Sequence, residues 1–257
     1  MNRCNKWLRF ACRAILLPAV FFFPAISRAG RPLSIDDAGT VEQGRFELEA
    51  GTFYWGNESI NHYEIPLGLT YGLCPNLELG IGYGGLAEER ILEQKEPRAR
   101  REYIRDFSDI ILAGKWNFLT GEERPFCSSL APSVKVPTAS RNKKCGTGEP
   151  DYDLTLIFSG NLGEKTGVHL NAGYTWIGDP PSENLSDVLH YGIALDHCIL
   201  PGLVAVGEIT VNDFTEDGDA VQYRLGYRWN FCDGAVFDAA YGGRISGSVP
   251  DNIFTIG

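Results

Sequence analysis

Residues 45–54 read RFELEAGTFY and set the pattern for most of the chain. Phe46, Leu48 and Ala50 alternate with Glu47 and Glu49. Because successive side chains of a β-strand point to opposite faces, this alternation predicts a strand with one apolar face and one charged face. The spacing of three or four residues that marks an amphipathic helix is almost absent from the chain.

Runs with the same period of two follow one another to the end of the chain. Clusters of Gly, Pro, Asn and Asp separate them, which is typical of strands joined by turns. Including the first, we count twelve runs, which begin near residues 46, 63, 77, 107, 126, 151, 168, 188, 203, 220, 236 and 252. The chain is therefore predicted to be all-β, with about 12 antiparallel strands in up-and-down order.

The predicted connections alternate between short and long. Cys74-Pro75-Asn76 and Cys232-Asp233-Gly234 are tight, whereas the connections over 84–106 and 138–150 are long. Short turns on one side and long loops on the other are typical of transmembrane β-barrels of the bacterial outer membrane, where the turns lie in the periplasm. Both ends of the chain are then expected in the periplasm.

The first 29 residues have the composition of a secretory signal peptide. Four basic residues precede an apolar run over 14–26, and Ser27-Arg28-Ala29 offers small residues at positions −3 and −1 of a cleavage site. This run is shorter than the roughly 20 residues that a spanning helix needs. We therefore predict cleavage after Ala29, an N-terminal periplasmic segment over 30–42, and a β-barrel over 43–257 whose last strand is short or truncated.

Two observations favour a barrel in a membrane over a soluble β-sandwich, which is the alternative. No later window approaches 18 consecutive apolar residues, so only closed strands could cross a bilayer. Aromatic residues gather near both ends of the predicted strands, with Tyr152 and Trp176 toward the loops and Trp116 and Trp229 toward the turns. Two such belts are expected at two lipid interfaces.

Composition narrows the range of partners. The chain beyond residue 29 carries 18 Lys and Arg against 33 Asp and Glu, a formal net charge of −15. A charge of this sign disfavours nucleic acid as a partner. The cysteine spacings fit no zinc or haem pattern, so we expect neither a metal nor another cofactor.

Several ordered segments resemble one protein family. They are Arg31 to Thr40 followed by Gly44 to Glu49, Ser108 to Trp116, Val134 to Thr138, Gly146 to Tyr152, and Asp238 to Gly242. These segments are similar to the family described as the MetA-pathway of phenol degradation, a group of transporter-like outer-membrane barrels. The resemblance covers nearly all of the mature chain and implies uptake of small, often aromatic, compounds. Such barrels usually end in a full strand that closes on an aromatic residue, whereas this chain ends at Ile256-Gly257.

The charged faces of the strands would line the interior of such a barrel, because Arg or Lys facing lipid at mid-depth costs about 2 to 4 kcal/mol. On the pairing that we predict, Glu208 lies opposite Gly226 and diagonally near Arg224, and Arg228 lies opposite Asp238. We hypothesise a cluster of Glu208, Arg228 and Asp238 that either neutralises interior charge or forms a selective constriction. The candidate permeation residues are Glu47, Glu49, Glu208, Arg224, Arg228 and Asp238. About 12 strands allow a narrow pore or a plugged one, and whether residues 30–41 plug it is left open.

Four cysteines fall near the predicted periplasmic turns, in a compartment where disulfides persist. The pairs Cys74–Cys127 and Cys198–Cys232 are the disulfide candidates. Free thiols at the same turns are the alternative.

Together these inferences predict an outer-membrane channel for passive uptake of small molecules, hydrophobic or aromatic ones among them, and not an enzyme. Its partners would be outer-membrane lipid and lipopolysaccharide, the permeant, and the barrel-assembly machinery. One alternative is an outer-membrane lipid-modifying enzyme, which would need a nucleophile placed beside a base. The only histidines are His62, His169, His190 and His197, and none lies in a recognisable nucleophile motif. The other alternative is a structural or adhesive barrel without transport.

Overall fold

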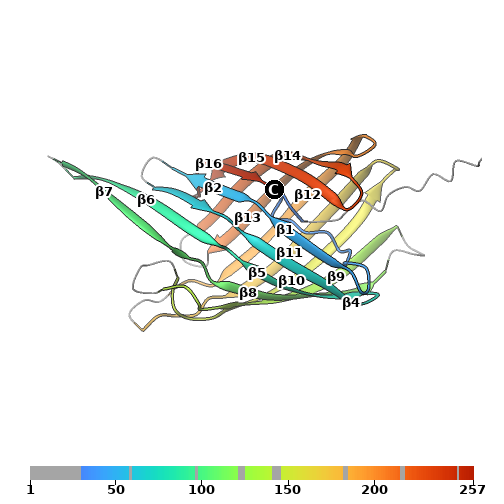
Figure 1. Ribbon diagram of the computed structural model, residues 1–257, viewed down its shortest axis with the longest axis horizontal. Coiled ribbons are helices and arrows are strands. Elements are labelled where there is room, and N and C mark those ends of the chain that lie inside the picture. Colours follow the sequence, from blue (N-terminus) through green and yellow to red (C-terminus); the bar gives the residue numbers. More distant parts are fainter. Residues whose placement is uncertain are drawn as a thin grey trace, which may run out of the picture.

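The computed structural model describes residues 30–57, 60–95, 98–120, 125–140, 146–181, 185–214, 218–247 and 249–257 (Figure 1). The predicted signal peptide, residues 1–29, lies outside the described residues. Every regular element of the described part is a β-strand, which confirms the prediction of an all-β chain. A helix long and apolar enough to cross a membrane is not found in this part of the chain.

Sixteen strands of the described part form one sheet, and neighbouring strands pair in antiparallel fashion. They are β1 (Phe46–Ala50), β2 (Thr52–Gly56), β3 (Ile60–Glu64), β4 (Leu67–Cys74), β5 (Leu77–Tyr83), β6 (Leu86–Lys95), β7 (Arg98–Phe107), β8 (Ile110–Leu119), β9 (Phe126–Val136), β10 (Asp151–Leu162), β11 (Thr166–Trp176), β12 (Val188–Leu200), β13 (Leu203–Phe214), β14 (Gly218–Cys232), β15 (Ala235–Ser246) and β16 (Asn252–Ile256). The hydrogen-bonded order is β1-β4-β5-β8-β9-β10-β11-β12-β13-β14-β15-β16-β2-β3-β6-β7.

The prediction of about 12 strands is wrong for two local reasons. Two predicted runs are each divided, at Gly51 between β1 and β2 and at Ile65-Pro66 between β3 and β4. Proline has no backbone N–H to donate to a ladder, so it interrupts a central strand. The long loop predicted over 84–106 instead forms β6 and β7, a paired hairpin that extends beyond the other strands (Figure 1, upper left). Its many charged residues hide the period of two on which the prediction relied.

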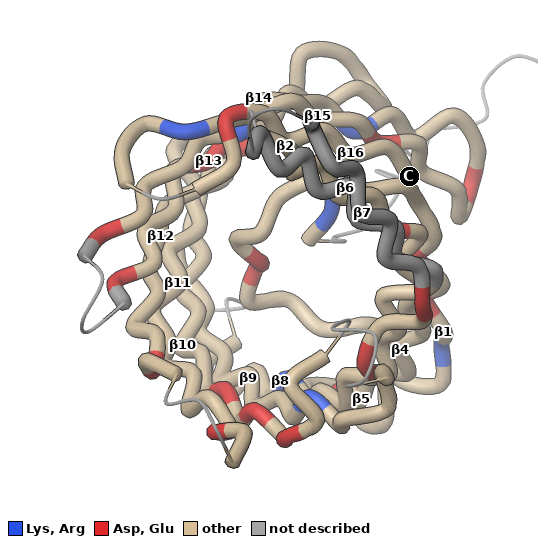
Figure 2. Tube along the Cα trace, turned by 90° about the vertical axis from the view of Figure 1, so that its left-hand side faces the viewer, with Lys and Arg blue, Asp and Glu red and all other residues tan. Residues whose placement is uncertain are grey.

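The sheet curls around a common axis, but its ladder is not a closed ring (Figure 2). The last strand, β16, pairs with β15 through Ala239–Gly242 and with β2 through Thr52–Gly56. β1 pairs with β4 and stands at one end of the ladder, while β7 stands at the other. The expected closed barrel is therefore not found in that form, because β1 and β7, the two ends of the ladder, do not pair with each other.

The two faces of the sheet differ in polarity as the alternation predicts. On β1, Phe46 and Leu48 are exposed, whereas Glu47 and Glu49, which alternate with them, are half-buried. The same holds around the sheet, where large apolar side chains are exposed and polar ones are buried. The buried polar or charged side chains of the strands are Lys115, Asn117, Ser128, Ser129, Thr155, Ser159, Asn171, Glu208, Arg228, Asp238 and Thr255. This order is the reverse of that in most soluble proteins.

Connections of different length mark two sides of the sheet. On one, which we call the turn side, only two or three residues join β4 to β5, β10 to β11, β12 to β13 and β14 to β15. Gly163 and Gly234 have φ of 74° and 76° in two of these turns, and glycine adopts such angles without the strain that a Cβ would bring. The opposite side, the loop side, carries the longer connections over 137–150, 177–187 and 247–251.

Neither predicted disulfide is formed, because Cys74, Cys198 and Cys232 carry free thiols. Two strands, β5 and β8, lie between β4 and β9, which carry Cys74 and Cys127. One strand, β13, lies between β12 and β14, which carry Cys198 and Cys232. Since neighbouring strands are about 4.8 Å apart, both pairs are separated by more than the roughly 7 Å that a disulfide can bridge between Cα atoms.

This separation leads to a prediction about the thiols. Protein alkylated under denaturing, non-reducing conditions should carry the label on Cys74, Cys198 and Cys232. Its peptide map should not change when a reductant is added before alkylation. A peptide pair that is joined through two of these cysteines without reductant would contradict the separation of the strands.

Candidate functional site

Residues 30–42, which we call the inner segment, contact the buried polar face of the sheet. Leu33 and Ile35 form an apolar cluster with Ala194 on β12 and with Val204 and Val206 on β13. All five side chains are buried. The inner segment is therefore held on the inside of the curled sheet, and its remaining contacts are polar.

Glu208 on β13 is the first polar anchor of the inner segment. Its Oε2 accepts the backbone N–H groups of Ser34 and Ile35, each at 2.8 Å. The Glu208 side chain is only 1% exposed. A buried carboxylate needs such donors, because burial without them leaves a charge that lacks both water and a partner.

Three arginines form the second group of contacts. Arg228 donates from Nε to the carbonyl oxygen of Arg31 at 2.6 Å, and Arg224 donates from Nη1 to that of Pro32 at 3.4 Å. The side chain of Arg31 in turn binds Asp238, with Nε 3.3 Å from Oδ2, and donates to Thr255 at 3.1 Å. Strands β14, β15 and β16 thus hold one end of the inner segment.

Lys115 on β8 anchors the middle of the inner segment from the other side of the sheet. Its Nζ lies 2.9 Å from a carboxylate oxygen of Asp36 and 3.3 Å from one of Glu78, and it donates to the carbonyl of Asp37 at 3.2 Å. Glu78 accepts the N–H of Val41 at 2.5 Å. Burial raises the pKa of the Asp37 carboxyl above its ordinary value, while the charge of Lys115 lowers it and offsets part of the rise.

Ala38 is bound through both of its backbone polar groups. Its N–H donates to Ser159 Oγ at 2.8 Å, and its carbonyl accepts from Asn117 at 2.6 Å and from Ser129 at 2.5 Å. These partners come from β10, β8 and β9. Each of them lies at an inward position of the alternating pattern, so the same period of two that builds the strands also supplies the anchors.

A serine, a histidine and an aspartate lie in line beside Ala38. Ser159 Oγ is 2.8 Å from His169 Nδ1, and His169 Nε2 is 3.4 Å from Asp196 Oδ2. This is the combination of a nucleophile, a base and an orienting group. The serine oxygen, however, also accepts the N–H of Ala38, so Ser159 is at the same time an anchor of the inner segment.

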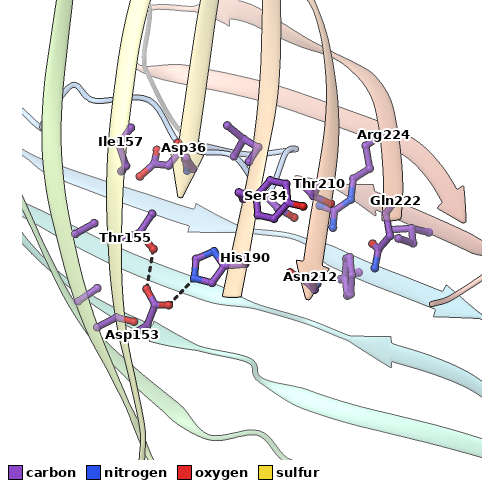
Figure 3. Close-up of a pocket in the computed structure, with 18 of the residues that line it drawn as sticks. Ser34, Asp36, Asp153, Thr155, Ile157, His190, Thr210, Asn212, Gln222 and Arg224 are labelled. Carbon is purple, nitrogen blue, oxygen red and sulfur yellow. Dashed lines mark hydrogen bonds and ion pairs between the residues drawn. The ribbon is translucent and has the colours of Figure 1, made fainter. Parts of the chain in front are cut away.

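Among the described residues, the inner segment has a cavity on each of its two sides, within the curled sheet. The loop-side cavity has a volume of about 490 Å³ and is shown in Figure 3, where Asp153 and His190 lie on one side and Arg224 and Gln222 on the other. The turn-side cavity has a volume of about 500 Å³. Asp36 lines the first cavity and Asp37 the second. The inner segment therefore separates the two cavities between these adjacent residues.

The predicted permeation residues are distributed as follows. Arg228 lies opposite Asp238, as expected, but Glu208 pairs with Arg224 and not with Gly226. The register differs by two residues because Phe214 pairs with Gly218, which makes the connection shorter than the predicted loop over 215–219. A shift by two keeps every side chain on its predicted face.

The inner segment joins the predicted cluster of Glu208, Arg228 and Asp238. Glu208 and Arg228 bind backbone groups of the inner segment, and Asp238 binds the side chain of Arg31. The three residues therefore bind the inner segment and not one another. Glu47 and Glu49 face the interior from β1, and the Oε1 of Glu49 is buried with no hydrogen-bond partner. Among the described residues, no group of His, Cys, Asp or Glu side chains could hold a metal ion.

Sequence reasoning places the charged side chains of the strands, Lys115 among them, on the inward face and leaves open whether residues 30–41 plug the interior. It does not identify Lys115, Ser129 or Ser159 as anchors of the inner segment. Polar and apolar residues do not alternate in the four-residue stretch Ser34 to Asp37, so the pattern gives no signal there. The contacts of this stretch also depend on backbone groups, which every residue carries. Lys115, Ser129 and Ser159 do carry a signal, since each is a polar residue at an inward position. That signal alone does not distinguish an anchor from a residue that only faces water.

Comparisons with solved structures find outer-membrane channels of similar fold. The COG4313 outer membrane channel from Pseudomonas putida F1 aligns with a TM-score of 0.61 at 16% identity, covering 86% of this chain and 96% of that one. The NanC porin aligns with a TM-score of 0.56 at 10% identity, covering 82% and 97%. The KdgM porin, solved in complex with disordered oligogalacturonate, aligns with a TM-score of 0.52 at 8% identity, covering 81% and 97%.

At these identities the likeness concerns the fold alone. A search among curated proteins finds no match. One family model does match the sequence, over residues 29–255, and this span includes the inner segment and nearly every strand. The chain therefore belongs to the family described as Putative MetA-pathway of phenol degradation.

Proposed function

We propose that the chain is an outer-membrane channel for passive uptake of small molecules, hydrophobic or aromatic ones among them. The observation that carries this proposal is the reversed polarity of the sheet, with apolar side chains outside and charged side chains around two inner cavities. An apolar exterior suits the acyl chains of a membrane, and a polar interior suits a water-filled path. The similar fold of known outer-membrane channels supports the same location.

In this function the inner segment is the constriction of the path. It lies between the two cavities and is held mainly by side chains of the wall. A segment held in this way can change position without breaking the strand ladder, since its anchors are separate hydrogen bonds of about 0.5 to 3 kcal/mol each. The permeant would pass where the segment moves aside.

The exterior would contact outer-membrane lipid and lipopolysaccharide, and the barrel-assembly machinery would insert the chain. An enzymatic role is less well supported, because the nucleophile-like arrangement found among the described residues uses its serine oxygen to hold Ala38. The structural neighbours are also porins and channels rather than enzymes. A purely adhesive barrel would not need two cavities divided by an anchored segment.

The membrane location predicts a depth-dependent cost for outward charge. Leu170 lies in the middle of β11 and is 46% exposed, so Leu170→Arg should lower the free energy of unfolding from lipid vesicles by about 2 to 4 kcal/mol. Leu162→Arg, at the turn-side end of β10, is the matched control and should cost about 0 to 1 kcal/mol. Equal costs at both positions in a urea titration would count against a membrane-embedded exterior.

The anchoring of the inner segment can be tested by hydrogen exchange. Glu208→Ala removes the acceptor of the Ser34 and Ile35 N–H groups, so these amides should exchange about tenfold faster or more. Glu64→Ala is the control, since Glu64 also faces inward but binds Ser108. Unchanged protection of residues 33–37 in Glu208→Ala would refute the anchor.

Conductance tests the channel itself. The double variant Glu208→Ala with Lys115→Met removes anchors on both sides of the inner segment and should conduct more than the parent in planar bilayers. Small solutes should also swell liposomes that contain it faster than liposomes with the parent. If the variant inserts and neither conducts nor swells liposomes, the chain is not a channel.

A further inference from the structure

One wall of the loop-side cavity presents hydrogen-bond donors that the protein does not use. Thr210 and Gln222 face each other across β13 and β14, and Asn212 and Arg224 are the next inward residues on these strands. Figure 3 shows these four residues on one side of the cavity. Among the described residues, no hydrogen bond is made by the side chains of Asn212 or Gln222, or by Nη2 of Arg224.

Arg224 is placed here by its strand neighbour and by an aromatic ring. It pairs with Gly242 on β15, where a Cβ would lie 2.6 Å from Arg224 Cγ, so the absent side chain leaves room for the arginine. Its guanidinium carbon lies 5.6 Å from the centre of the Phe53 ring, within the range of a cation–π contact. Trp55, on the same strand as Phe53, also lines the cavity.

The arginines around this wall are matched by an equal number of carboxylates. Arg31, Arg224 and Arg228 lie near one another, and each faces one carboxylate. Arg31 binds Asp238, and Arg224 Nε lies 3.5 Å from Glu208 Oε1. Arg228 lies 4.0 Å from Asp196. Both oxygens of Glu208 are engaged, one by Arg224 and the other by the inner segment. Asp196 is shared with His169 and with the N–H of Gly167. The terminal nitrogen of Arg224 is therefore available to a further anion.

The acids on the opposite side of the cavity have partners of their own. Asp153 accepts hydrogen bonds from Thr155, Thr175 and His190, at 2.8, 2.8 and 2.7 Å. Asp36 forms its ion pair with Lys115. An anion at the Arg224 wall would consequently not displace the hydrogen bonds of Asp153 or the ion pair of Asp36.

We propose that this wall is a binding subsite for a small aromatic carboxylate. The carboxylate would bind Arg224 together with the side-chain amides of Gln222 and Asn212, and the ring would lie against Phe53 and Trp55. A guanidinium is well suited to such a group because it offers two parallel N–H donors. The cavity volume of about 490 Å³ is within the usual range for small-molecule sites. This subsite rests on the proposed function for its role, since it would select permeants on the loop side of the constriction.

Binding is measured on the full mature protein in detergent, with sodium benzoate as the probe at constant ionic strength. The affinities are measured by calorimetry. Benzoate should bind at least tenfold more tightly than benzyl alcohol, which lacks the charge. It should also bind more tightly than cyclohexanecarboxylate, which lacks the aromatic ring. Arg224→Met should weaken benzoate binding by about ten- to a hundredfold. Arg244→Met removes an exposed arginine that binds Asp251, and it should bind benzoate as the parent does.

A second variant guards against a folding defect, because Arg224 also contacts the inner segment. The side chain of Gln222 does not contact the inner segment among the described residues. Gln222→Leu should therefore weaken benzoate binding about two- to tenfold, while the affinity for benzyl alcohol stays the same. Equal binding of benzoate and benzyl alcohol to the parent, or unchanged benzoate binding in Gln222→Leu and Arg224→Met, would overturn the subsite. Benzoate binding in detergent by a protein that conducts no solute would support the subsite and overturn the channel.

Discussion

Ionised side chains that converge on the interior of a curled sheet must each find a partner, since a buried charge without one is costly. In this chain the inner segment provides many of those partners. Its backbone N–H groups bind Glu208, its carbonyls bind Arg228 and Lys115, and its own charged side chains bind Asp238 and Lys115. The interior is therefore both charged and filled. The position of the inner segment follows from the need to provide these buried charges with partners.

The contacts that compensate the buried charges also determine where the cavities of the interior lie. Because the anchors come from β8, β9, β10, β13 and β14, the inner segment crosses from one wall to another and leaves a cavity on either side. In the proposed channel, the inner segment would be the constriction of the path, and the cavities on its two sides have different linings. Aromatic rings and unused donors occur in the loop-side cavity, whereas the turn-side cavity contains the serine, histidine and aspartate beside Ala38.

The outer surface of the sheet has the opposite requirement, namely an apolar environment for its exposed side chains. Apolar side chains that are exposed over the whole sheet would be unfavourable in water, and they find a suitable environment in acyl chains. Free thiols and short turns lie on one side, and the long connections lie on the other. The chain thus has the polarity and asymmetry of the outer-membrane channels whose fold it resembles.

The sequence by itself determined the features that repeat at short range. The alternation on β1 and on the strands after it predicts both faces of the sheet, and the Gly- and Pro-rich clusters predict the tight turns. The resemblance of its ordered segments also identified the family, which the match over residues 29–255 confirms. These features need only neighbouring residues, so one sequence is enough to infer them.

Only the tertiary structure decided which distant residues meet. Strand order separates Cys74 from Cys127 by two strands, the short connection after Phe214 sets Glu208 opposite Arg224, and Pro66 divides a run that the pattern left whole. The site of the inner segment could not be inferred, because Ser34 and Ile35 bind Glu208 across more than 170 residues through their backbone. Backbone groups are the same in every residue, so their partners depend on how the whole sheet curls and not on local sequence.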